Sequence, residues 1–255
     1  MMRQHFIRCA VIGGAFGLMA AATQSASAQN LLTNGNLDQC YAQEIVPGFF
    51  LPKPRNWVND GSRAISGPYE DEMSSEPWAG PAPTPVTTDG DANPPDGVGI
   101  GADGGVFFKP FSGNATDGAA TGHLYQDVAG APGQTYTLTG WAGGEANALM
   151  QDAVLAIEFR NAGGLISMSS LSMLPTLVTP NGQAFNYKQY SVSGLAPVGT
   201  TIVRARVSMI GAMSNPAGGG QAFVVDDFVL SVPEPTSLAV VALGALGLVA
   251  RRRRA

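Results

Sequence analysis

The stretch GHLYQDVAGAPGQTYTLTGWA, residues 122–142, decides the fold class of this chain. Residues 122–128 and 134–142 are two short segments with strand-like patterns, and the second is rich in aromatic and Thr residues. Ala131-Pro132-Gly133 between them is typical of a tight turn. In the second segment large apolar side chains recur with a period of two, at Tyr136, Leu138 and Ala142. This period is that of a strand with one face in a core, so we predict a β-hairpin.

Strand patterns continue on the C-terminal side of this hairpin. Further strands are predicted at residues 153–160, 165–167, 187–192, 200–210 and 223–230. In residues 200–210 the side chains predicted to face inward are Val203, Ala205, Val207 and Met209, opposite Arg204 and Arg206. The chain has 33 Gly and 18 Pro and no long helical periodicity. We therefore predict an all-β protein whose residues 29–231 form one antiparallel β-sandwich.

The region 58–117 differs from the rest of this predicted domain. It is rich in Pro, Gly and Asp, and its apolar runs are short. We predict long loops around short strands here, one of them at residues 105–108.

Both ends of the chain have the composition of targeting segments. Arg3 and Arg8 precede an apolar run, and Ala26-Ser27-Ala28 is a small-residue cleavage motif. This order is typical of a Sec signal peptide, so we predict that signal peptidase removes residues 1–28 after Ala28.

The C-terminal segment, residues 232–255, combines three parts. Pro233-Glu234-Pro235 precedes an uncharged apolar run of 14 residues, Ser237 to Ala250, and the arginine cluster Arg251, Arg252, Arg253 and Arg254 follows. As a helix the apolar run would span roughly 21 Å, which is less than the ~30 Å of a bilayer core. The arginines would hold its end on the cytoplasmic side. These features favour a short transmembrane anchor that is later removed, with a permanent marginal anchor as the alternative.

This arrangement resembles the PEP-CTERM sorting signal of Gram-negative bacteria. The resemblance implies export through the Sec translocon, a transient inner-membrane anchor and processing by an exosortase. The product would then reach the cell surface or the extracellular matrix.

The charge and cysteine content restrict the function classes. Arg3, Arg8 and the arginine cluster are six of the 14 Lys and Arg residues, and all 19 Asp and Glu residues lie between Asp38 and Glu234. Without these six arginines the net charge falls from −5 to −11. An acidic chain with so few cations is not expected to bind nucleic acid. Cys40 is the only cysteine after residue 28, so no disulfide is expected within the domain.

Three local patterns resemble the galactose-binding-like jelly roll found in many carbohydrate-binding modules. They are the opening residues 30–38 (NLLTNGNLD), the hairpin at 124–138, and the last strand at 223–230 (FVVDDFVL). The resemblance implies a jelly-roll sandwich. It also implies one structural calcium where the opening segment meets the last strand, held by Asp38 with Asp226 or Asp227. A solvated acidic turn is the alternative, and a second acidic loop at residues 89–96 is another calcium candidate.

Candidate ligand-binding residues are the tryptophans and the paired arginines. Trp141 has the parity opposite to Tyr136 and Leu138, so it is expected to point away from the core. Trp57 lies near the loops, as do Tyr69 and Trp78. Arg204 and Arg206 could hydrogen-bond sugar hydroxyls. The alternatives are that the tryptophans pack against the sandwich and that the arginines form its wet face.

No catalytic residues are predicted. His123 is the only histidine after residue 28, and it is expected on the surface or in a turn. We expect a non-catalytic surface or matrix protein that interacts with exopolysaccharide. The alternatives are a purely structural envelope or biofilm-matrix protein and an exopolysaccharide hydrolase.

Overall fold

The structure is a computed structural model of the chain. It describes residues 29–37, 39–63, 75–77, 106–108, 118–177, 187–213, 215–216 and 221–232. Both predicted targeting segments lie outside these residues, except for Val232, and so do Asp38, Trp78 and the acidic loop at 89–96.

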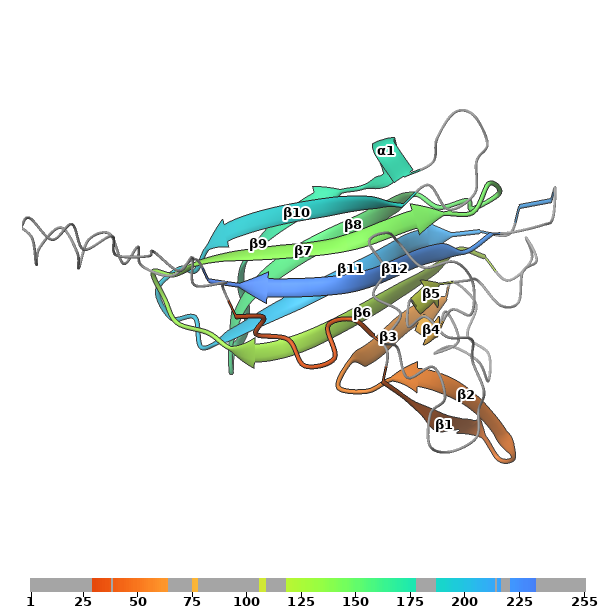
Figure 1. Cartoon of the computed structure of the whole chain (residues 1–255), viewed down its shortest axis with the longest axis horizontal. Coiled ribbons are helices and arrows are strands. Elements are labelled where there is room, and N and C mark those ends of the chain that lie inside the picture. The colour runs from red at the N-terminus through yellow and green to blue at the C-terminus, as the bar shows by residue number, and fades with distance from the viewer. Residues whose placement is uncertain are drawn as a thin grey trace, which may run out of the picture.

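Two antiparallel five-stranded sheets form a sandwich (Figure 1). Sheet I has the strand order β3 (Val58–Arg63), β6 (Ala120–Ala129), β11 (Ile202–Ala212), β8 (Asp152–Asn161) and β9 (Gly164–Ser172). Sheet II has the order β10 (Lys188–Leu195), β7 (Thr135–Gly144), β12 (Phe223–Ser231), β5 (Val106–Phe108) and β4 (Ser75–Pro77). The predicted all-β sandwich is therefore confirmed.

The core between the sheets is built from the alternating positions of the predicted strands. Tyr136 is 3% exposed, and Leu138 and Val203 are fully buried. All the side chains predicted to face inward on the segments at 134–142 and 200–210 belong to this core. Trp141, Arg204 and Arg206, on the opposite face of these strands, are only half-buried. Strand parity thus decided which side chains enter the core.

The opening segment is hydrogen-bonded to β12 without forming a strand of its own. Leu31 N donates to Leu230 O at 2.8 Å, and Phe228 N donates to Gly35 O at 2.7 Å. The side chain of Asn30 accepts from Leu230 N and donates to Phe228 O. Residues 33–36 of this segment form a turn. The carboxamide of Asn30 therefore takes the place of the backbone N–H and C=O groups that a neighbouring strand would offer to β12.

A two-stranded hairpin, β1 (Cys40–Val46) and β2 (Phe49–Pro54), projects from the sandwich (Figure 1). No strand was predicted here. Pro52 and Pro54 in β2 would disfavour a central strand. Each strand of this small sheet has only one neighbour, so an edge exists for the prolines to occupy.

The region predicted as loop-rich begins with a regular strand. β3 pairs with β6 over six residues, from Val58 opposite Tyr125 to Arg63 opposite Ala120. The predicted short strand at residues 105–108 is present as β5. The one described helix is the single turn α1 (Leu174–Leu177). Among the described residues, no helix has the length and apolarity needed to cross a membrane.

Candidate functional site

Trp141 lies on the outer face of sheet II, on β7. Its neighbours in register are Gln189 on β10 and Asp226 on β12. Directly opposite residues on adjacent strands have Cβ atoms about 4.5–5.5 Å apart, so these three side chains form one row. Trp141 is half-exposed and Gln189 is exposed, whereas Asp226 is 5% exposed. The predicted direction of Trp141, away from the core, is confirmed.

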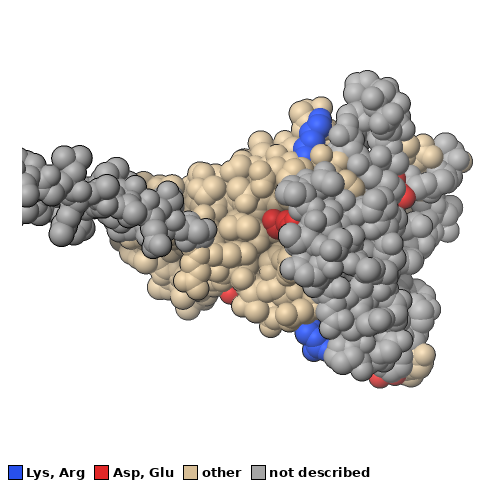
Figure 2. All heavy atoms as spheres, in the orientation of Figure 1, with Lys and Arg blue, Asp and Glu red and all other residues tan. Residues whose placement is uncertain are grey.

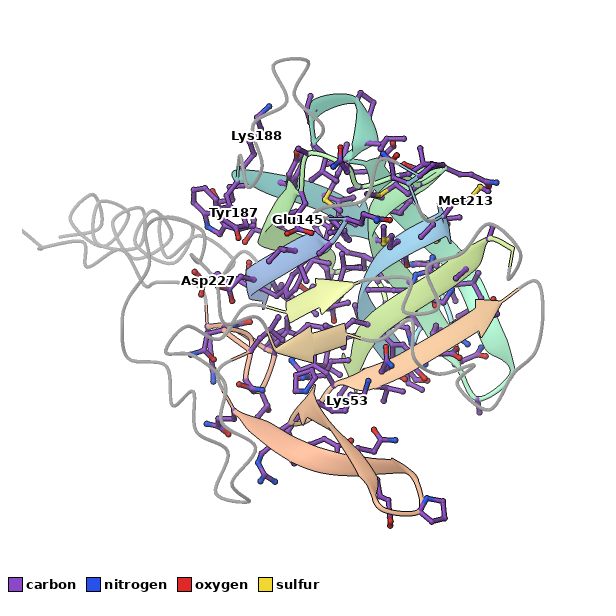
Figure 3. All side chains as sticks on the ribbon, turned by 90° about the vertical axis from the view of Figure 1, so that its right-hand side faces the viewer. Lys53, Glu145, Tyr187, Lys188, Met213 and Asp227 are labelled. Carbon is purple, nitrogen blue, oxygen red and sulfur yellow. The ribbon has the colours of Figure 1, made fainter. Side chains whose placement is uncertain are left out.

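A second aromatic ring lies beside Trp141. Gly143 is two residues further along β7 and therefore on the same face. A Cβ added at Gly143 would come within 2.7 Å of the ring of Tyr187, so the glycine makes room for that ring. Figure 3 shows Tyr187 and Asp227 on the same side of the sandwich, pointing away from it. Tyr187 was not predicted as a ligand-binding residue. Gly143, two residues after Trp141, was a sequence signal that a bulky side chain could lie there.

Hydroxyl side chains continue the same face from Trp141 toward the start of β7. The other outward positions of β7, β10 and β12 include Thr135, Thr137, Thr139, Ser191, Ser193 and Ser231. Thr137 Oγ1 and Ser193 Oγ are hydrogen-bonded at 2.8 Å. Figure 2 shows that the described surface over these strands carries few charged side chains. We call this surface, made of Trp141, Tyr187, Gln189, Asp226 and the six hydroxyl residues, the Trp141 face.

Trp57 was predicted as a candidate ligand-binding residue, but its side chain is buried and offers no exposed platform. It is 6% exposed, its ring centroid lies 5.3 Å from that of Phe228, and its Nε1 donates to Asn34 O at 2.8 Å. A buried Trp needs a partner for its N–H group, and Asn34 provides it. Tyr69 and Trp78 lie outside the described residues.

Arg204 and Arg206 lie on the outer face of sheet I, where they make ion pairs. Arg204 donates two hydrogen bonds to Asp127, at 2.6 and 2.8 Å, and lies 3.6 Å over the ring of Tyr125. The hydrogen bond to Asp127 raises the pKa of Arg204. Arg206 pairs with Glu158 at 2.6 Å, and Arg160 pairs with the second carboxylate oxygen of Glu158. These arginines thus already have carboxylate partners within the sheet.

His123 lies within β6 and not in a turn, and it is half-buried at an outward position of sheet I. Its Nδ1 is 2.7 Å from Ser208 Oγ, and Asp60 of β3 is opposite it in the sheet. Burial lowers the pKa of His123, and the positive charge of Arg206 lowers it further. Ser208 is fully buried, so a substrate cannot reach its hydroxyl. This row has the residue types of a Ser-His-Asp triad without an accessible nucleophile.

The predicted calcium site is only partly within the described residues. The opening segment meets β12 as expected, and the register of β12 breaks between Asp226 and Val229. Asp227 has φ 51°, and its backbone N donates to Asp226 Oδ1 at 2.7 Å. Asp38 lies outside the described residues, within which no three His, Cys, Asp or Glu side chains are grouped to hold a metal. The calcium site stays a prediction.

The C-terminal end of the chain matches a family model. The match covers residues 231–254, and the model describes the PEP-CTERM protein-sorting motif. Residues 231–254 are a PEP-CTERM sorting motif. The motif begins at the last residue of β12, so the sorting segment directly follows the final strand of the sandwich. Its presence indicates an exported protein with a membrane-associated sorting signal.

Solved structures with a similar fold include carbohydrate-binding modules. TmCBM61, described in complex with β-1,4-galactotriose, is 18% identical with a TM-score of 0.43, over 80% of this chain and 99% of that one. The CBM22-1 xylan-binding domain of Paenibacillus barcinonensis Xyn10C is 11% identical with a TM-score of 0.41, over 71% of this chain and 88% of that one.

A phage enzyme domain has a similar fold as well. The enzymatically active domain of bacteriophage CBA120 tailspike protein 4 is 10% identical with a TM-score of 0.46 over 80% of this chain. This chain spans 21% of that domain's length. At these identities and TM-scores, the likenesses decide nothing about a ligand. No curated protein matches the sequence.

Proposed function

We propose that the protein is an exported, non-catalytic surface protein that binds neutral polysaccharide through the Trp141 face. The observation that carries this proposal is the pair of rings, Trp141 and Tyr187, on one sheet face that continues into a row of hydroxyl side chains. Ligand sites combine aromatic walls with a few polar groups that fix orientation. A sugar ring offers C–H groups to an aromatic face and hydroxyls to Gln189 and the Ser and Thr side chains.

The low charge of the Trp141 face favours a neutral glycan. The charged side chains of β12 on this side of the sandwich, Asp226 and Asp227, are both acidic. A polysaccharide rich in carboxylates would meet this negative charge and gain no ion pair. The outer face of sheet I differs, because Arg204, Arg206 and Arg160 lie there beside Asp127 and Glu158.

The sorting motif supports a route to the cell surface. In this proposal the Sec translocon and signal peptidase act on residues 1–28, and an exosortase acts near Pro233-Glu234-Pro235. Intact-mass analysis of the material released from the producing cells tests this route. The expected product begins at Gln29 and lacks Arg251 to Arg254, and a released species that retains these arginines would contradict it.

The binding test compares two aromatic residues on opposite sheets. Trp141→Ala is expected to lower the affinity of the exported protein for neutral polysaccharide at least about tenfold, by loss of a stacking platform. Tyr125→Ala is the matched control, because Tyr125 is also half-buried on an outer face but lies under Arg204. Its affinity should equal that of the wild type.

Isothermal titration and affinity electrophoresis with neutral and acidic polysaccharides provide the measurement. Absence of binding to every neutral glycan would favour the purely structural alternative. Release of reducing ends from a bound polysaccharide would favour the hydrolase alternative. If Trp141→Ala and Tyr125→Ala lower the affinity equally, neither outer face is identified as the binding site.

A further inference from the structure

β9 is an edge strand of sheet I, and its sequence contains neither a charged residue nor a proline. The three other edge strands of the sandwich contain at least one of these: β3 has Asp60 and Arg63, β4 has Glu76 and Pro77, and β10 has Lys188. Charges and prolines on edge strands hinder the pairing of one molecule with another. Among the described strands of the sandwich, β9 is therefore the one edge without this protection.

β9 has one described neighbour in its sheet. It pairs with β8 from Gly164 to Ser172, with one bulge at Ile166. An antiparallel edge strand turns the N–H and C=O groups of every second residue away from its single neighbour. Within the described part of the chain, no strand pairs with that side of β9. A further strand added there would form hydrogen bonds with these groups.

Large apolar side chains are exposed along this edge. The exposed fractions are 54% for Leu165, 38% for Ile166 and 45% for Met168. Val198, in the turn between β10 and β11, is 93% exposed. A Cβ added at the next residue, Gly199, would lie 3.8 Å from Ile166 Cδ1, so this turn is beside β9. Exposed apolar side chains that are grouped in this way mark an interaction surface.

The charges around β9 permit a second copy of the chain to approach. Without the six arginines of the targeting segments the net charge is −11, and such a charge opposes association. The acidic excess is absent from β9 and the next two strands of the sheet, β8 and β11. Their charged residues are Arg160, Arg204 and Arg206 against Asp152 and Glu158. Two acidic molecules therefore meet little repulsion at this edge.

We propose that β9 pairs with β9 of a second copy of this chain, so that the two five-stranded sheets form one continuous sheet. A two-fold axis perpendicular to the sheet makes the two copies of β9 antiparallel, which is the pairing that sheet I already uses. Pairing the whole strand places Met168, its middle residue, opposite the same residue of the second copy. The inference does not depend on the proposed function, because the Trp141 face belongs to sheet II.

The size of the edge predicts a weak, reversible dimer. β9 has nine residues. At about 3.3 Å per residue and about 10 Å between the sheets, this edge measures about 30 Å by 10 Å, or about 300 Å² per copy. Standard protein–protein interfaces bury about 800 Å² per partner. The dimer should therefore form only at high protein concentration.

Sedimentation equilibrium of the exported protein, over about a hundredfold range of concentration, measures this association. The average mass should rise from that of the monomer toward that of the dimer. Met168→Lys should raise the dissociation constant about tenfold, because two like charges would lie opposite each other near the axis. Val58→Lys is the matched control and should associate like the wild type. Val58 is 47% exposed and lies on β3, the opposite edge of the same sheet.

Ser170→Lys keeps the test decisive if Met168→Lys alters the fold. Ser170 is exposed, lies two residues after Met168 on the same face of β9, and its variant should also weaken the dimer. Trp141→Ala should leave the association unchanged, so the dimer and the proposed glycan site can fail separately.

Hydrogen exchange of the β9 amides identifies what covers this edge. Their protection should rise with protein concentration. Protection that is the same at every concentration would mean that another segment of the chain covers β9, and the proposal would be wrong. It is also wrong if the wild type stays monomeric throughout, or if folded Met168→Lys and Ser170→Lys both associate like the wild type.

Discussion

The indole nitrogen of Trp57 donates a hydrogen bond to the backbone carbonyl of Asn34, 2.8 Å away and 23 residues earlier in the chain. Asn34 has the left-handed φ of 53°, and its side chain binds both ends of the β1–β2 hairpin. The pair therefore connects the opening turn, the hairpin and the core through one residue. Trp57, which was expected near the loops, is therefore a core residue.

Replacing Trp57 by Phe should lower the free energy of unfolding by about 1–3 kcal/mol, because the buried carbonyl of Asn34 loses its donor. Urea unfolding of the exported protein measures this loss. Trp141→Phe is the control and should change the free energy by less than about 0.5 kcal/mol, because Trp141 is half-exposed and outside the core. Equal effects would mean that the hydrogen bond of Trp57 adds nothing.

Gly140→Ala should destabilise the sandwich by about 1–3 kcal/mol through overpacking. A Cβ at Gly140 would lie 2.5 Å from two ring atoms of Phe228, which is 2% exposed and packed on Trp57. Gly163→Ala is the control, because its nearest contact is the Asn161 side chain at 3.1 Å in an exposed turn. Adding Phe228→Leu to Gly140→Ala should recover part of the loss. A neutral Gly140→Ala would show that the ring moves freely.

Glu158 and Asp127 should differ in their contribution to stability although both pair with arginines. The Glu158 side chain is 3% exposed and faces Arg160 and Arg206. Glu158→Gln should therefore cost about 3–5 kcal/mol, the usual effect of breaking a buried ion pair. Asp127 is 39% exposed in its side chain, and Asp127→Asn should cost at most about 1 kcal/mol and less in high salt. Thermal melting at two salt concentrations distinguishes the two cases.

His123 should make the stability of the protein depend on pH. Its pKa in the folded state is lowered, mainly by burial, from the unfolded value of 6.5. Below that value the unfolded chain binds more protons than the folded one, so stability falls as pH drops from about 6.5 toward the folded pKa. Well above pH 6.5 His123 is neutral in both states, so its contribution to the free energy of unfolding no longer changes with pH.

His123→Gln isolates this contribution from that of the carboxylates. The difference between wild type and variant in the free energy of unfolding, measured by urea titration from pH 5 to pH 8, should rise with pH and then level off. A difference that is flat or falls with pH would contradict the lowered pKa.

Calcium remains the sharpest test of the link between the opening segment and β12. If Asp38 and Asp226 or Asp227 hold an ion, millimolar calcium should raise the melting temperature by several degrees relative to EDTA. A hundredfold excess over Kd contributes about 2.7 kcal/mol. Asp38→Ala should remove this difference. Identical wild-type melting in calcium and EDTA would show that the site does not exist.

The sequence by itself determined which segments form the long strands and which side chains enter the core. Period-two alternation in β7 and β11 requires one face to be apolar, so Leu138 and Val203 could be assigned to the core without a structure. The sorting motif was equally readable, because it depends on a local order of residues that needs no folding partner.

The tertiary structure alone decided what surrounds each candidate residue. Trp141 lies between Gln189 and Asp226 because β7 pairs with β10 and β12, which follow much later in the chain. Arg204 meets Asp127 across 77 residues for the same reason. Alternation specifies the face of a strand, whereas its neighbours and register depend on how well whole sheets pack. For that reason the sequence indicated a half-exposed Trp141, and only the folded chain brought Tyr187 beside it and buried Trp57.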